Sequence, residues 1–157
     1  MNQRTGGPDK RSAHHSLAWL AYIAFVVYGS LVPLDFHPLP ADQAWAAFKQ
    51  LPMLQLGIES RADWVANGVL YFPAGFLTVT LFRQRRTLLS RWMVPLGAML
   101  FCFALALVVE YTQLFFAPRT VSLNDVIAEF IGSVLGIAAA CYWSDGFGKL
   151  LAAGLAF

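Results

Sequence analysis

Four apolar segments, each close to the length of a membrane-spanning helix, constrain the fold of this chain more than any other feature. They cover residues 16–34, 64–82, 92 to about 116, and 126–143. A helix needs roughly 20 predominantly apolar residues to cross a bilayer. Hydrophobic residues make up 58% of the chain and charged residues only 13%, a balance that soluble domains rarely have. The sequence therefore predicts an all-α integral membrane protein, a four-transmembrane-helix bundle without a soluble domain.

The basic residues predict how this bundle is oriented. They concentrate before the first span and in the loop between the second and third spans: Arg4, Lys10, Arg11, Arg83, Arg85, Arg86 and Arg91. Cytoplasmic loops carry an excess of Lys and Arg, so both termini are predicted to be cytoplasmic. The expected organisation is a cytoplasmic N-terminal segment (1–15), a single membrane domain (16–143) and an apolar cytoplasmic tail (144–157).

The longest predicted outer loop contains a short amphipathic pattern. Apolar side chains recur at helical spacing between two prolines: Ala44, Trp45, Phe48 and Leu51. We expect a short helix at the membrane interface, with Asp42 and Lys49 facing water. It serves either as a lid over a polar site or as a simple connector that dips its aromatic rings into lipid.

Polar side chains gather at the predicted outer ends of the spans. They are Asp35, His37, Asp63, Asn67, Glu110, Gln113, Arg119, Asp125 and Glu129. A carboxylate within a spanning helix costs roughly 2.5 to 3.5 kcal/mol on insertion scales, so such a residue is a functional-site hypothesis by default. Gln113 follows Glu110 by three residues and shares its helical face. The sequence thus predicts a polar site at the outer interface.

These residues also form a recognisable set of motifs: Asp63-x-x-x-Asn67, Phe72-Pro73-x-Gly75, Glu110-x-x-Gln113, Arg119, Asp125 and Gly132-x-x-x-Gly136. With them the chain resembles the VanZ-like family of bacterial membrane proteins over about residues 32–143. Where the family usually has Asn four residues after the Asp of the fourth helix, this chain has Glu129. The resemblance implies a multi-pass cell-envelope protein of the bacterial cytoplasmic (inner) membrane. The family's namesake is linked to teicoplanin resistance, but the resemblance implies no settled biochemical activity.

The charges of the predicted site require compensation. Asp125 and Glu129 lie four residues apart and would repel each other as two anions on one helix face, so a proton, Arg119 or a bound cation should intervene. Asp125 is placed to cap the helix N-terminus as an anion. We expect the deeper Glu129 to be the protonated group.

Several site residues have both a structural and a functional interpretation. Arg119 is either a bidentate partner of Glu110 or Asp125, or a clamp for a lipid phosphate. Asn67 and Gln113 are either hydrogen-bonding links between helices or ligands. A local salt bridge is the simpler expectation for Arg61 and Asp63.

Glycine spacing also predicts a helix contact. Gly132-x-x-x-Gly136 allows another helix to approach closely, either within the chain or from a second copy. Packing within the chain is the more economical expectation.

Three function hypotheses follow. The first is binding or handling of a lipid-linked, phosphate-bearing envelope intermediate, with ligand-binding candidates Arg119, Gln113, Asn67, Asp63 and Glu129. The second is an enzyme acting on such a lipid, with Glu110 or Asp125 as the acid-base group and Arg119 stabilising charge. The third is a non-catalytic scaffold or assembly factor. The sequence leaves open whether the chain is an enzyme.

Cofactors and partners are less constrained. No cofactor is predicted; Asp35, His37, Asp63, Glu110, Asp125 and Glu129 form an oxygen-rich set that a divalent metal would accept, but without close ligand spacing, so no metal site is assigned. The expected partners are membrane lipids, a lipid-linked precursor, and a second copy or another membrane protein. Nucleic acid is not expected.

Overall fold

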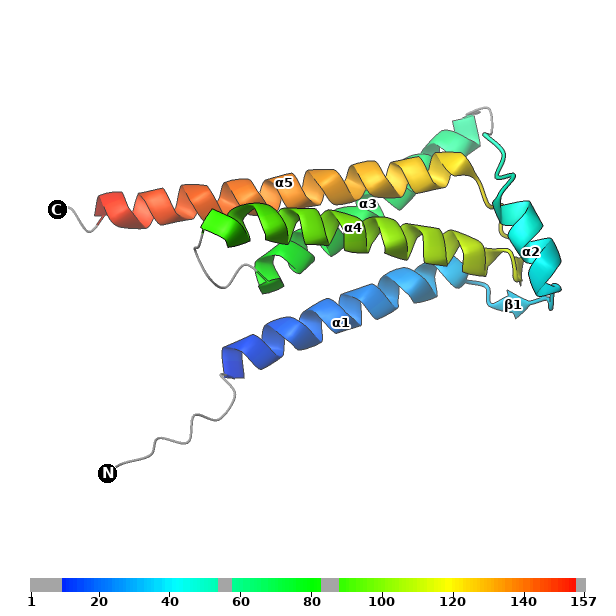
Figure 1. Ribbon diagram of the computed structural model, residues 1–157, viewed down its shortest axis with the longest axis horizontal. Helices are drawn as coiled ribbons and strands as arrows, with labels where there is room; N and C mark the ends of the chain where they lie inside the picture. The colour runs from blue at the N-terminus through cyan, green and yellow to red at the C-terminus, as the bar shows by residue number, and fades with distance from the viewer. Residues whose placement is uncertain (1–9, 54–57, 83–87, 155–157) are drawn as a thin grey trace, which may run out of the picture.

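The protein is built from helices that lie side by side. The computed structural model describes residues 10–53, 58–82 and 88–154. Within these ranges the helices are α1 (Lys10–Leu31), α2 (Ala41–Phe48), α3 (Ile58–Phe82), α4 (Leu88–Gln113) and α5 (Leu123–Gly154). Two short strands, β1 (Asp35–Phe36) and β2 (Phe116–Ala117), complete the fold. Figure 1 shows α2 and β1 at one end of the long helices, which we call the α2 end, and the start of α1 and the end of α5 at the opposite end.

Three helices have the length and composition of membrane spans. Within the described residues these are Arg61–Phe82 of α3, Arg91–Gln113 of α4 and Leu123–Trp143 of α5. The prediction of a helical fold with helices long and apolar enough to cross a membrane is therefore confirmed. The expected first span, in α1, is not among the three, since α1 begins with polar residues that lower its mean hydropathy, including Lys10 and His14.

Element boundaries differ from the expected ones in two places. The first apolar run was predicted to continue to residue 34, but α1 ends at Leu31. The last apolar span was predicted over residues 126–143, and the candidate span in α5 also ends at Trp143. Helix α5 itself runs on to Gly154, so the predicted tail begins within this helix. The short helix expected in the long loop is present as α2, with both Asp42 and Lys49 exposed.

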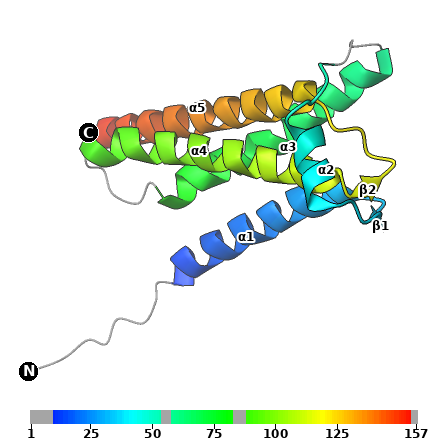
Figure 2. The same ribbon diagram turned by 45° about the vertical axis from the view of Figure 1, so that its right-hand side comes forward.

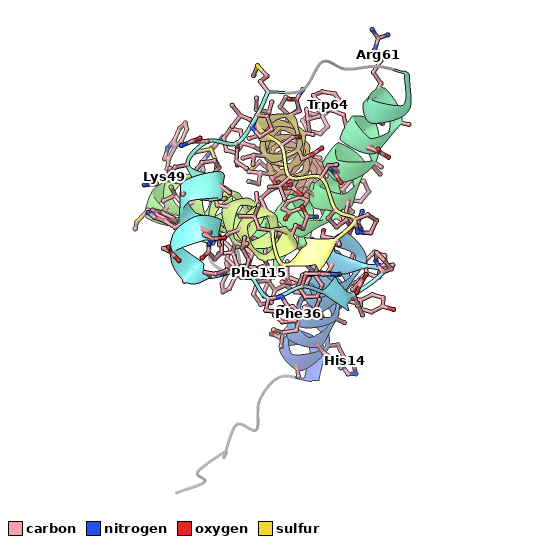
Figure 3. The ribbon with its side chains drawn as sticks, turned by 90° about the vertical axis from the view of Figure 1, so that its right-hand side faces the viewer. His14, Phe36, Lys49, Arg61, Trp64 and Phe115 are labelled. Atoms are coloured by element: carbon pink, nitrogen blue, oxygen red, sulfur yellow. The ribbon has the colours of Figure 1, made fainter. Side chains whose placement is uncertain are left out.

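At the α2 end, two loops far apart in sequence are joined. Strands β1 and β2 pair antiparallel, with Phe36 opposite Phe116 (Figure 2). The His37 N–H also donates to the Phe115 carbonyl at 2.8 Å, and the Phe36 and Phe115 rings stack with their centroids 6.4 Å apart (Figure 3). These contacts hold the loop after α1 against the loop between α4 and α5.

Helices α3 and α5 approach each other at the level of their backbones. A Cβ added at Gly132 would overlap the carbonyl oxygen of Gly68, and one added at Gly136 would overlap that of Phe72. A Cβ at Gly75 would overlap the carbonyl oxygen of Ser133. The predicted glycine contact is therefore confirmed as packing within the chain.

Helix α1 is attached differently, through side chains. The Trp19 indole N–H donates to the Thr78 hydroxyl of α3 at 2.9 Å, and the Tyr22 hydroxyl donates to the Leu70 carbonyl at 2.8 Å. The Trp19 ring also packs against Phe82, with centroids 6.1 Å apart. These indole and phenol groups fix α1 beside α3 without a close backbone contact.

Candidate functional site

The candidate site is organised around the start of α5. Ser122 immediately precedes this helix and is buried. Its hydroxyl oxygen accepts a hydrogen bond from the Asp125 N–H at 3.3 Å and donates to Asp125 Oδ2 at 2.6 Å. A serine before the first helical residue satisfies N–H groups that the helix leaves unpaired, and a carboxylate in the first turn is favoured by the helix dipole. Capping by Ser122 therefore fixes the position of Asp125, which was itself expected to be the cap but instead accepts the Ser122 hydroxyl.

Two other helices reach this cap. Glu110, near the end of α4, is only 1% exposed, and its Oε2 accepts the Ser122 N–H at 3.3 Å. Asn67 of α3 donates from Nδ2 to Asp125 Oδ1 at 2.9 Å. The structure thus brings Asn67, Glu110 and Asp125 together, and Ser122 links two of them.

Sequence reasoning missed Ser122. Its signal was present, because Ser122-x-x-Asp125 directly before an apolar run is a recognised mark of a helix N-terminus. In the folded chain the Ser122 N–H goes to Glu110 of another helix instead of to the acidic residue of its own first turn. The cap therefore connects helices as well as ending one.

Glu129 lies one turn deeper in α5 and is 1% exposed. No described residue hydrogen-bonds to its Oε2 atom, and the same is true of the fully buried Tyr71 hydroxyl of α3. Glu129 interacts electrostatically with Glu110 and Asp125, and Tyr71 interacts with Glu129. Tyr71 was also missed, although it follows Asn67 by four residues and therefore shares its helical face.

Arg119 and Gln113 do not join this cluster directly. Gln113 Nε2 donates to the Ser30 carbonyl at 2.8 Å, and Arg119 Nη2 donates to the Gly29 carbonyl at 2.9 Å. The last carbonyls of a helix have no partner within it, and a cation there is favoured by the helix dipole. Both side chains therefore cap the end of α1.

The expected ion pairs of Arg119 are not formed. Within the described residues its guanidinium makes no ion pair within 4 Å with Glu110 or Asp125, although it interacts electrostatically with Glu110 over a longer range. Its Nη2 atom instead donates to the Gly29 carbonyl. Arg119 is exposed, and a guanidinium has five N–H donors, so further donors remain for an anion.

Asp63 and Arg61 lie apart from the cluster. Both are exposed on the first turns of α3, and they do not form the predicted salt bridge with each other. Figure 3 shows Arg61 pointing away from the helices. Solvent screens exposed charges, so little is gained by pairing them.

The oxygen-rich set considered for a metal separates into distant parts. Asp35 and His37 are exposed and lie near each other, with His37 Nδ1 3.7 Å from Asp35 Oδ1. Glu110 and Glu129 are buried among the helices. In the part of the chain that the structure describes, no three or more His, Cys, Asp or Glu side chains are arranged to hold a metal ion.

The chemistry available at the α2 end is that of buried carboxyl groups beside an exposed cation. Glu110 and Asp125 have hydrogen-bond partners that fix their orientation, as a proton-transfer group requires. Arg119 offers N–H groups of the geometry that matches phosphate and carboxylate oxygens.

Comparison of the sequence with known proteins identifies the family of this chain. No curated protein and no solved structure was found to match the chain. The family model described as VanZ/LLP1 matches residues 10–144, which include all five described helices in whole or in part and every residue of the candidate site. The chain belongs to the VanZ/LLP1 family.

Proposed function

We propose that this protein binds a lipid-linked, phosphate-bearing cell-envelope intermediate at the α2 end of its helices. In this proposal Arg119 holds the phosphate, and Glu110 and Asp125 orient an attached sugar or amine. The observation that carries the proposal is an exposed guanidinium, with donors to spare, on the loop that leads into a buried, hydrogen-bonded carboxyl cluster.

The proposal includes the membrane topology. Figure 1 shows α1 converging on the other long helices towards the α2 end, and Trp19 and Tyr22 bond to α3, so we take α1 as a fourth span. The basic loop residues then place both termini in the cytoplasm and the α2 end at the outer leaflet of the inner membrane. A lipid headgroup on that side would meet Arg119 at the interface, where a charged side chain stays partly solvated.

Phosphate binding fits the chemistry of Arg119 better than a purely structural role. Capping the Gly29 carbonyl uses one of its nitrogen atoms, whereas phosphate recognition uses two parallel N–H groups of the planar fork. Gln113 caps the neighbouring Ser30 carbonyl without any charge. Capping at this helix end is therefore possible without a charge, and the N–H donors that Arg119 does not use for capping are available to a ligand.

A second candidate function is catalysis on the same lipid. The observation that favours it is the network around Ser122, which orients both Glu110 and Asp125. One of these carboxyls would act as the acid-base group while Arg119 stabilises developing negative charge on a phosphate. The scaffold hypothesis is favoured by a different observation, namely that Arg119 and Gln113 both bind the α1 backbone.

Native mass spectrometry of the full chain tests the proposal with a matched pair of probes, a polyprenyl phosphate and the polyprenol that lacks the phosphate. We expect the wild type to retain the phosphate-bearing lipid in preference. Arg119→Ala should remove this preference, and Glu110→Gln should keep it.

Two control variants separate binding from packing. Gln113→Ala removes the other cap of α1 but no charge, and Arg61→Ala removes an exposed arginine that points away from the helices. Both should keep the preference. Equal retention of the two lipids by the wild type, or equal loss in Arg119→Ala and Gln113→Ala, would contradict a phosphate clamp.

A further inference from the structure

Polar side chains continue inward from the candidate site along the faces that three helices turn towards one another. They recur about one or two turns apart on each helix: Asn67, Tyr71 and Thr78 on α3, Glu110 and Cys102 on α4, and Asp125, Glu129 and Ser133 on α5. All except Asn67 and Asp125 are buried. The bundle therefore encloses a line of polar groups between helices that are otherwise apolar.

The inner part of this line is hydrogen-bonded. The Thr78 hydroxyl accepts the Trp19 N–H and donates to the Ala74 carbonyl at 2.7 Å. The Ser133 hydroxyl donates to the Glu129 carbonyl at 2.8 Å. These groups have the partners that buried polar atoms normally have, and they act as links between or within helices.

The middle of the line is different. The Tyr71 hydroxyl and Glu129 Oε2 are buried, and neither has a hydrogen-bond partner among the described residues. Leaving a buried donor or acceptor unsatisfied costs about 1 to 3 kcal/mol, and more for a charged group. Two such atoms, on facing helices and in electrostatic contact, indicate a place that takes up a small hydrogen-bonding species.

The charges around Glu129 indicate which species. Glu110 faces it from α4 and Asp125 lies on its own helix, while Tyr71 and Cys102 contribute only neutral groups at neutral pH. From α1, Tyr22 has already donated its hydroxyl to Leu70.

The only described cation that interacts with this cluster is Arg119, which reaches Glu110 over a longer range and is paired with neither Glu110 nor Asp125. An isolated ionised carboxylate in an apolar interior is so unfavourable that it neutralises instead. Among the described residues, no group of three or more His, Cys, Asp or Glu side chains could hold a metal ion, and no ion pair to Glu129 is formed. A proton is the smallest species that neutralises a carboxylate in such a place.

We propose that Glu129 and Tyr71 form a proton-binding site inside the bundle, which exchanges with solvent past Asp125 and Glu110 at the α2 end. A proton from bulk water adds to the Glu129 carboxylate and gives a neutral carboxylic acid, and its release restores the carboxylate. The site needs no lipid ligand, so this proposal can be tested independently of the proposed phosphate binding.

Difference infrared spectroscopy of the full chain in lipid nanodiscs tests this inference. The wild type should show the carbonyl stretching band of a protonated carboxylic acid at neutral pH, where exposed carboxyls are ionised. Glu129→Gln should abolish the band. Tyr71→Phe should shift it by removing a hydrogen-bonding neighbour, and Asp42→Asn, at an exposed position on α2, should leave it unchanged.

Labelling keeps the test decisive if Glu129→Gln does not fold. Glutamate carrying a ¹³C carboxyl should move the wild-type band, and Glu110→Gln should then retain it. A wild-type spectrum without the band would overturn the inference, and so would a band that the label does not move. A band lost in Glu110→Gln but kept in Glu129→Gln would assign the proton to the other carboxyl and also overturn it.

Discussion

The contact between α3 and α5 and the contact between α1 and α3 hold the same bundle together in different ways. In the first, glycines bring one backbone directly against another, at Gly68 with Gly132 and at Phe72 with Gly136. In the second, the side chains of Trp19 and Tyr22 reach across to α3. The α2 end of α1 is then held by Gln113 and Arg119.

The difference predicts that the α3–α5 contact is the stronger one and that α1 is held more weakly. A backbone contact leaves no space for an added methyl group, and helices in lipid associate largely through such close packing. Side-chain hydrogen bonds between membrane helices contribute less, because the separated helices find other partners. We expect α3 and α5 to form the stable frame of the site and α1 to be the helix that detaches most easily.

The largest effect should come from breaking the glycine contact. A Cβ in Gly132→Ala would overlap the Gly68 carbonyl oxygen and lie 2.7 Å from its carbon. Overpacking of this kind typically costs about 1 to 3 kcal/mol, and unfolding in detergent should show it. Gly97→Ala is the matched control, because an added Cβ there meets nothing within 4 Å. Equal stability of the two variants would mean that α3 and α5 are not in backbone contact.

A smaller effect is expected at the start of α5. Ser122→Ala removes both hydrogen bonds of the hydroxyl to Asp125 but keeps the backbone N–H that Glu110 accepts. Loss of such a cap typically lowers the free energy of unfolding by about 1 kcal/mol. Ser122→Thr retains a hydroxyl and should recover most of this stability. If both variants lost the same amount, shape rather than capping would be the cause.

The smallest effect should come from loosening α1. Tyr22→Phe removes its hydrogen bond to the Leu70 carbonyl, and interhelical hydrogen bonds in membrane proteins average only about 0.6 kcal/mol. Hydrogen exchange should become faster in α1 while exchange in α3 and α5 stays unchanged. Tyr142→Phe is the control, because Tyr142 is 82% exposed. Faster exchange in all helices would show that α1 belongs to the same cooperative unit as the α3–α5 pair.

Much of the fold could be predicted because a membrane-spanning helix requires a continuous apolar segment, which can be seen in the sequence. Apolar length predicted the three helices that are candidate membrane spans, and the spacing of Trp45 and Phe48 predicted α2. The same reasoning placed the first helix end three residues too late, since hydropathy alone does not show where a helix ends. It predicted the end of the last span at Trp143 but not that α5 continues to Gly154, because a change in polarity need not end a helix.

The sequence predicted which residues form the candidate site but not which hydrogen-bond partners they have. Glu110, Asp125 and Asn67 do meet, because adjacent helix ends bring them to one place. Arg119 was expected to pair with a carboxylate, but it binds a backbone carbonyl of α1. The sequence cannot show which backbone carbonyl will accept a hydrogen bond, because every residue has one.

Sequence alone determined the membrane character, the family and the end of the bundle where the candidate-site residues gather, because these follow from side-chain type and spacing along one chain. Only the tertiary structure decided which partners those residues have. In it the Ser122 N–H donates to Glu110, Arg119 and Gln113 donate to carbonyls of α1, and Tyr71 and Glu129 are both buried within electrostatic reach of each other. The physical reason is that a hydrogen bond depends on position to within a few tenths of an ångström, and such positions are set by how the helices and loops pack in three dimensions.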